Sequence, residues 1–230
     1  MEKVKEIKEK KKLYYQVKFI IIGNPNVGKT NIYYKFVNGE FSNKYQPTIV
    51  LDFQYQTIKI NEKFFTLQLW DTAGSEDYKS ITKGYYSNST CCILVYDLTE
   101  EDSFNSIIDW VEDVKNYTSP KTILILVGNK YDLSEERKIS KEQGEALASQ
   151  YGMTYIEASA KTGYNIDEIF NIACQKIYEN IDKKIYNFNN YDEPCGVKKC
   201  YANDDLSSQK TFTLKKKNNN IHIHKKKKIC

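Results

Sequence analysis

Residues 23–30 read Gly-Asn-Pro-Asn-Val-Gly-Lys-Thr, a loop that few folds can accommodate. The loop follows an apolar run at 16–22, which is typical of a strand, and precedes a stretch that predicts a helix from Gly28 to Val37. A loop of the form G-x-x-x-x-G-K-[ST] between a strand and a helix presents backbone N–H groups and a helix N-terminus to an anion. We therefore expect this loop to bind phosphate groups.

The rest of the chain alternates strands with helices. Two continuous apolar runs, 91–96 and 122–127, favour strands buried on both faces, and residues 51–60 and 63–70 alternate in polarity and predict an antiparallel hairpin. Periodicity and capping signals predict three more helices and a short strand, which are 102–116, 140–150, 165–181 and 153–157. This order predicts an α/β fold, in which a six-stranded, mostly parallel sheet has one antiparallel edge strand and helices on both faces.

The 230 residues are enough for one domain and a tail. Helical and strand periodicity fades after about residue 183 into Asn, Asp, Lys and Ser, so we expect a charged extension at 1–14, one P-loop domain at 15–182, and a flexible basic tail at 183–230. None of the six cysteines lies in a paired Cys-x-x-Cys, so neither a zinc site nor a disulfide framework is expected.

A second motif, Asn129-Lys130-Tyr131-Asp132, follows the strand at 122–127. A fixed carboxylate such as Asp132 accepts two N–H bonds from guanine, from N1 and the 2-amino group. Adenine lacks this pair of donors and would leave a buried carboxylate unpaired. We expect Asn129 to tie this loop to the phosphate loop. The motif therefore favours a guanine nucleotide over an adenine nucleotide.

Glu157-Ala158-Ser159-Ala160-Lys161 follows the next predicted strand. At this position the backbone N–H of Ala160 is expected to meet guanine O6, and the stems of Lys130 and Lys161 to lie on the ring faces.

The remaining polar residues suit Mg²⁺ and the terminal phosphate. Lys29 brings a charge to the β- and γ-phosphates, the Thr30 hydroxyl is a Mg²⁺ ligand, and Asp71, at the end of the strand 63–70, holds Mg²⁺ through water. Thr48 completes the Mg²⁺ shell only with GTP, and the Gly74 N–H meets the γ-phosphate. The two loops that carry Thr48 and Gly74 are therefore expected to be ordered by GTP and released after hydrolysis.

The motif order GNPNVGKT, PT, WDTAG, NKYD, EASAK resembles the Ras superfamily over residues 16–181. Within it, IVLDF, LQLWDTAG, YKSITKGYY and LVYDLT look like those of Rab proteins. The resemblance implies nucleotide contacts from Asn26, Val27, Gly28, Lys29, Thr30, Asn31, Phe41, Tyr45, Thr48, Asp71, Gly74, Asn129, Lys130, Asp132, Ser159, Ala160 and Lys161, with Mg²⁺ held by Thr30, Thr48 and Asp71.

The resemblance to Rab proteins also implies that Phe53, Trp70 and Tyr85 form an aromatic surface patch that effector proteins bind. The alternative is ordinary core packing, because large aromatic residues on strands are usually buried.

Two departures from the family pattern bear on catalysis. The family has Gln after Asp-Thr-Ala-Gly, where this chain has Ser75, which is too short to orient the attacking water. The expected catalytic residues are Lys29, Thr48, Gly74 and Ser75. The presence of Ser75 in place of Gln predicts slow intrinsic GTP hydrolysis. An activator of the TBC class, which supplies Gln and Arg in trans, would restore the rate. Pro25 also removes one N–H from the phosphate loop, although binding should persist.

The C-terminal segment departs from the usual pair of Rab cysteines. It ends in Lys225–Lys228, Ile229 and a single Cys230, and residues 195–230 hold ten Lys and two Asp. Prenylation of Cys230 together with the basic run would anchor the chain to a membrane, and the alternative is an unmodified tail held by charge alone. The charged N-terminus is not typical of a secretory signal. We therefore expect a cytoplasmic protein, peripheral on the cytosolic face of endomembranes.

The resemblance predicts a GTP/GDP switch of the Rab type that regulates vesicle traffic. Its expected partners are an exchange factor, a TBC-type activator, a GDP-dissociation inhibitor or escort protein, and effectors. The main alternative is a GTP-bound scaffold that recruits effectors without cycling. A nucleic-acid-binding GTPase rests only on the Lys-rich tail, and no nucleic-acid partner is expected.

Overall fold

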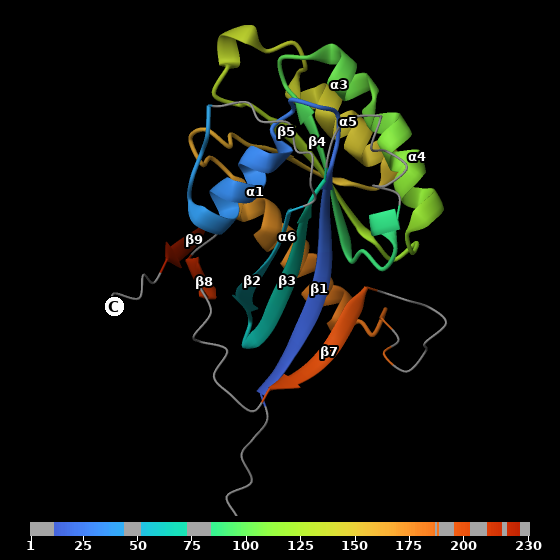
Figure 1. Cartoon of the computed structure of the whole chain (residues 1–230), viewed down its shortest axis with the longest axis vertical. Coiled ribbons are helices and arrows are strands. Elements are labelled where there is room, and N and C mark those ends of the chain that lie inside the picture. Colours follow the sequence, from blue (N-terminus) through green and yellow to red (C-terminus); the bar gives the residue numbers. More distant parts are fainter. Residues whose placement is uncertain are drawn as a thin grey trace, which may run out of the picture.

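The computed structural model describes residues 12–43, 52–72, 84–186, 188, 196–202, 211–217 and 220–225. The centre of the fold is a sheet in the order β6-β5-β4-β1-β3-β2 (Figure 1). Its strands are β1 (Lys12–Ile22), β2 (Asp52–Ile60), β3 (Lys63–Asp71), β4 (Cys91–Asp97), β5 (Ile123–Asn129) and β6 (Thr154–Glu157). The main helices are α1 (Lys29–Asn38), α3 (Glu101–Asn105), α4 (Ile107–Tyr117), α5 (Lys141–Tyr151) and α6 (Ile166–Asp182).

The strand directions confirm the predicted α/β fold. β1 pairs in parallel with β3 and β4, and the parallel pairing continues from β4 to β5 and β6. The one antiparallel pair among these six strands is the hairpin of β2 and β3. Asn61 and Glu62 form its turn with φ values of 42° and 63°, the left-handed pair that matches the twist of a two-residue hairpin.

Two hydrophobic layers hold the helices against the sheet (Figure 1). On one face α1 and α6 meet through Phe36 and Phe170, whose rings stack at 3.7 Å. On the other face α4 buries Ile107, Trp110 and Val111 against β4 and β5. All of β4 is buried because helices cover both faces of the sheet, which explains why the strand is apolar up to Asp97 at its carboxyl end.

The helices follow the predicted ranges with one difference. The helix expected at 102–116 is divided into α3 and α4 at Ser106, whose hydroxyl donates to the carbonyl oxygen of Asp102 at 2.8 Å. At the start of α5, Ser140 and Gln143 form a capping box, which is the capping signal that predicts a helix at 140–150. None of the helices in the described part of the chain is long and apolar enough to cross a membrane.

The sheet contains more strands than the six that we expected. β7 (Val197–Ala202) pairs antiparallel with residues 12–17 of β1, β8 (Thr211–Lys217) pairs in parallel with β2, and β9 (Asn220–Lys225) pairs with β8. These three strands lie in the segment for which the sequence predicts a flexible tail, and that flexibility stays a prediction. β1 begins seven residues before its pairing with β4, so one edge of its first half is open to β7. The predicted domain limits stay a prediction.

Candidate functional site

The loop at 23–30 lies between β1 and α1, at the carboxyl ends of the parallel strands, and two of its glycines are required by close contacts. A Cβ atom on Gly23 would lie 2.1 Å from the carbonyl oxygen of Val95, and one on Gly28 would lie 2.3 Å from Nδ2 of Asn129. Gly23 and Gly28 also have φ values of 140° and 94°, which residues other than glycine rarely adopt. The loop therefore packs closely against β4 and the Asn129 side chain at two positions where only glycine fits.

Lys29 folds back over this loop and is 6% exposed. Its Nζ donates to the carbonyl oxygens of Gly23 at 2.9 Å and Asn24 at 2.7 Å. Burial lowers the pKa of Lys29 to about 8, and the charge of Asp71 opposes this shift. A buried ammonium group with carbonyl partners is placed to gain from an anionic ligand such as a phosphate.

The loop is anchored by contacts that sequence reasoning missed. The Asn24 side chain donates to the hydroxyl of Ser106 at 3.0 Å and accepts from Nε1 of Trp110 at 2.8 Å. These bonds join the loop to the break between α3 and α4. Asn24 stands at a variable position of the loop motif, and its partners are more than 80 residues away, so no local signal pointed to them.

Asp71 and Thr30 form a donor set that fits Mg²⁺. Asp71 ends β3 with its carboxylate buried, and neither oxygen has a hydrogen bond of good geometry among the described residues. Burial raises the pKa of Asp71 to about 6, although the nearby Thr30 hydroxyl and the charge of Lys29 lower it. A buried carboxylate beside a hydroxyl supplies the hard oxygen ligands that Mg²⁺ prefers.

Asn129 ties its own loop to the phosphate loop, as the sequence predicts, and it also contacts the loop after β6, which the sequence did not predict. It is 2% exposed, its Nδ2 donates to the carbonyl oxygen of Val27 at 2.8 Å, and its Oδ1 accepts from the backbone N–H of Ala160 at 3.2 Å. The phosphate loop, the loop after β5 and the loop after β6 therefore share one buried side chain.

The carboxylate of Asp132 is held in place from the next loop. The Ser159 hydroxyl donates to Oδ1 of Asp132 at 2.5 Å, and Nζ of Lys161 lies 3.7 Å from Oδ2. The predicted residues of the two loops are thus brought together, with one carboxylate at the centre.

Lys130 has a partner that sequence reasoning did not find. Its Nζ lies 2.5 Å from Oδ2 of Asp97, at the end of β4, and Oδ1 of Asp97 accepts from both the N–H and the hydroxyl of Thr99. Lys130 itself has a left-handed backbone with φ 67°. Asp97 therefore fixes the direction of the Lys130 stem, which the sequence predicts to lie along a base.

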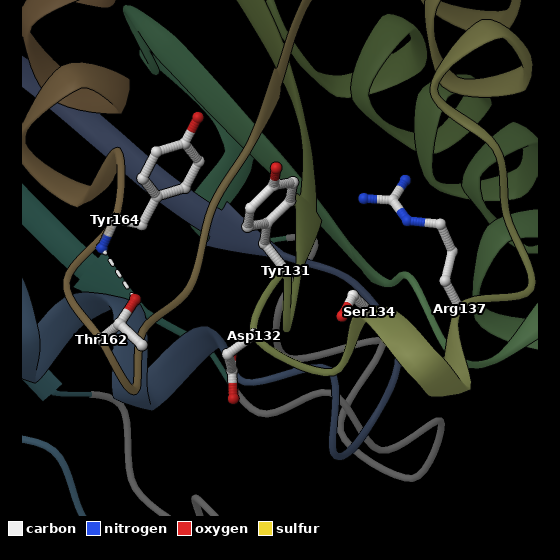
Figure 2. Close-up of a pocket in the computed structure, with 6 residues that line it drawn as sticks. All are labelled: Tyr131, Asp132, Ser134, Arg137, Thr162 and Tyr164. Carbon is white, nitrogen blue, oxygen red and sulfur yellow. Dashed lines mark hydrogen bonds between the residues drawn. The ribbon is translucent and has the colours of Figure 1, made fainter.

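The loops after β5 and β6 also line an open pocket that includes Asp132 (Figure 2). Its lining residues come from both loops and the segment that follows β5, and they are Tyr131, Asp132, Ser134, Arg137, Thr162 and Tyr164.

The three aromatic residues predicted to form a surface patch contact one another. The rings of Phe53 and Trp70 are 4.6 Å apart and those of Trp70 and Tyr85 are 5.4 Å apart, and all three side chains are half-buried. Nζ of Lys18 lies 5.0 Å from the Trp70 ring and donates to the carbonyl oxygen of Tyr85 at 2.6 Å. The patch is therefore one cluster at the surface, and its binding of effectors stays a prediction.

Other predicted contacts are peripheral or outside the described residues. Val27 is buried, Asn26 is exposed, Oδ1 of Asn31 accepts from the N–H of Ser42 at 3.3 Å, and Phe41 packs against the core. The remaining predicted residues lie outside the described residues, and these are Tyr45, Thr48, Gly74, Ser75 and Cys230.

One comparison with known proteins bears on this site. The sequence model of the Ras family matches residues 18–179, which is more than half of the chain and includes every described residue of the two base-reading loops and the phosphate loop.

Proposed function

The chain belongs to the Ras family of small GTPases, and we propose that within this family it is a Rab-type switch that regulates vesicle traffic. The observation that carries guanine-nucleotide binding is the contact of Asn129 with both Val27 and Ala160. The cluster of Phe53, Trp70 and Tyr85 supports the Rab assignment, because it offers effectors an assembled aromatic surface.

Different residues of the site would bind the phosphates, the guanine base and Mg²⁺. Lys29 would exchange its two carbonyl partners for phosphate oxygens, and Asp132 would accept the N1 and 2-amino hydrogens of guanine. Thr30 and Asp71 would hold Mg²⁺, which neutralises charge on the phosphates when it is bound.

Hydrolysis requires water to attack the γ-phosphorus in line with the bridging oxygen. The bond from phosphorus to that oxygen breaks, GDP leaves with the electron pair, and inorganic phosphate is released. We propose that this step is slow because Ser75 stands where the family has Gln, and that it depends on an activating protein.

The C-terminal segment is proposed to carry the protein to a membrane. Residues 225–228 are four consecutive lysines before Ile229 and Cys230. A prenyl group on Cys230 would supply the second signal that stable attachment requires. Mass spectrometry of the protein from its native cells tests this proposal, and an unmodified Cys230 would contradict it.

The hydrolysis proposal is tested by single-turnover measurements on the wild type and on Ser75→Gln, with Ser75→Ala as the matched control. We expect Ser75→Gln to hydrolyse GTP faster and Ser75→Ala to match the wild type, and we expect a TBC-type activator to accelerate the wild type. Equal rates for the wild type and Ser75→Gln would contradict the role given to position 75.

The bound nucleotide of the purified protein distinguishes the switch from the alternative of a GTP-bound scaffold. A cycling switch is recovered mainly with GDP, whereas a scaffold that does not cycle is recovered mainly with GTP. The Rab assignment predicts that a GDP-dissociation inhibitor extracts the GDP form from membranes.

A further inference from the structure

We propose that Tyr131 and Tyr164 form an aromatic clamp that holds the two guanine-recognition loops, 129–132 and 157–161, at the separation needed to bind guanine. Tyr131 precedes Asp132 in the first loop, and Tyr164 lies three residues after the end of the second. Neither tyrosine is assigned a contact with the nucleotide; both are positioning residues. The inference rests on the guanine-nucleotide binding proposed above.

The clamp is a stacked pair of exposed rings. The ring centroids of Tyr131 and Tyr164 lie 4.8 Å apart with 22° between the planes, within the range of favourable aromatic pairs. Figure 2 shows the two rings side by side above Asp132. Tyr131 is 41% exposed and Tyr164 is 47% exposed, and neither belongs to the two hydrophobic layers of the domain. Their contact therefore joins the loops without forming part of the core.

Arg137 adds a second connection between the same two loops. Its guanidinium carbon lies 5.6 Å from the centre of the Tyr131 ring, within the range of a cation–π contact. The same guanidinium donates to both carboxylate oxygens of Glu157, at 2.7 and 2.9 Å, and Glu157 begins the second loop. Tyr131 therefore contacts two residues that are connected to the second loop. Arg137 is connected to it through Glu157, and Tyr164 follows it in the chain.

Hydrogen bonds connect the clamp to the groups that would bind the base. The backbone N–H of Tyr131 donates to the carbonyl oxygen of Ala158 at 3.0 Å, and the carbonyl oxygen of Tyr164 accepts from the N–H of Ser159 at 3.0 Å. The Ser159 hydroxyl then donates to Asp132, the residue after Tyr131. The ring stack and these hydrogen bonds connect Tyr131, Tyr164, Ser159 and Asp132 to one another, so that the Asp132 carboxylate is restrained by several contacts at once. Loosening the rings would widen the distribution of carboxylate positions.

The backbone of the first loop explains why a clamp is needed there. Lys130, directly before Tyr131, has a φ of 67°, a conformation that disfavours residues other than glycine. That conformation persists only where neighbouring contacts hold it. The ion pair of Lys130 with Asp97 holds the strained residue itself, and the stack of Tyr131 on Tyr164 holds the residue after it.

The test measures release of GDP and of inosine diphosphate, which lacks the 2-amino group, from the full chain loaded with Mg²⁺. The variants are Tyr131→Ala, Tyr164→Ala, the double variant, and the conservative Tyr131→Phe and Tyr164→Phe. The matched control is Tyr117→Ala, because Tyr117 on α4 is also 47% exposed and contacts another ring, that of Tyr86, away from these loops.

We expect each alanine variant to release GDP roughly two- to twelvefold faster, the range that the energy of an aromatic pair corresponds to. The same variants should accelerate the release of inosine diphosphate less than that of GDP, because inosine diphosphate can donate only one of the two hydrogen bonds to Asp132. The double variant should match the single ones, and the phenylalanine variants and Tyr117→Ala should match the wild type.

Two outcomes would overturn the clamp while leaving nucleotide binding intact: unchanged release in both alanine variants, or equal acceleration of the two nucleotides, which would indicate general loosening of the domain. A wild-type protein that binds neither nucleotide would instead overturn the proposed function, and the clamp with it.

Discussion

The side-chain amide of Asn129 donates a hydrogen bond of 2.8 Å to the carbonyl oxygen of Val27, which joins the end of β5 to the loop that opens α1. The same amide accepts a hydrogen bond from the backbone of Ala160. Because the side chain is buried, both bonds are shielded from water, and the phosphate-binding and base-binding parts of the site are held at one separation.

Replacement of Asn129 by alanine is expected to leave the Val27 carbonyl and the Ala160 N–H buried without partners, which costs about 1–3 kcal/mol for each unsatisfied group. We expect a lower melting temperature and release of GDP that is faster by roughly tenfold or more. Fluorescent GDP displacement and thermal unfolding measure the two effects. Asn180→Ala, which removes a hydrogen bond to Tyr186 far from the loops, should leave GDP release unchanged.

Gly28→Ala is expected to abolish tight nucleotide binding, because the new Cβ would lie 2.3 Å from Nδ2 of Asn129. Gly152→Ala is the matched control: Gly152 also has a positive φ, 69°, but nothing lies within 4 Å of a Cβ there. It should cost about 1–2 kcal/mol in stability and leave binding intact. Titration calorimetry measures the affinity of both variants for GDP. Equal affinities would show that the expected clash between the new Cβ and Asn129 does not weaken binding.

Asp71→Asn is expected to remove most of the Mg²⁺-dependent slowing of GDP release, because a neutral amide attracts Mg²⁺ and the water bound to it less strongly than a carboxylate does. Release should be measured with Mg²⁺ and with a chelator. The variant should resemble the wild type in the chelator and differ from it in Mg²⁺. Asp182→Asn, at an exposed carboxylate paired with Lys63, should respond to Mg²⁺ as the wild type does.

Arg137→Met is expected to destabilise the domain by about 1–3 kcal/mol at pH 7, because the half-buried Glu157 carboxylate loses two charged hydrogen bonds. Burial alone would raise the pKa of Glu157, but hydrogen bonds from Arg137 and Tyr155 outweigh it and hold the pKa below its usual 4.5. A carboxyl whose pKa is lower in the folded state stabilises the fold above pH 4.5, and that contribution is lost as pH falls through the folded value.

The cost of Arg137→Met should therefore shrink as the pH is lowered from 7 to 4, which urea unfolding at each pH measures. Lys59→Met breaks the exposed pair with Glu62 and should cost less than about 0.5 kcal/mol at either pH. A cost for Arg137→Met that is independent of pH would show that Glu157 does not carry the effect.

Gly196→Ala is expected to detach β7 from β1 without affecting the nucleotide site. A Cβ on Gly196 would lie 2.4 Å from the carbonyl oxygen of Asn88, and its φ is 67°. Amide hydrogen exchange should become faster in residues 12–17, where β1 pairs with β7, while GDP release stays unchanged. Unaltered exchange in residues 12–17 would mean that β7 contributes nothing to the protection of β1.

Features with a local pattern could be predicted from the sequence alone. The hairpin turn at Asn61 and Glu62, the capping box of Ser140 with Gln143, and the strand–loop–helix unit around Lys29 depend on residues close together in the chain. The meeting of the three ligand loops also followed, because parallel strands bring their carboxyl ends to one edge of the sheet.

Contacts between distant parts of the chain were decided only by the tertiary structure. The bonds of Asn24 to Ser106 and Trp110, the stack of Tyr131 on Tyr164, and the pairing of β7 with β1 depend on which side chains and strand edges meet after folding. The sequence by itself determined a nucleotide-binding α/β domain, because periodicity and motif spacing are local properties. Packing determined how its loops are held together, because that requires partners that no local pattern identifies.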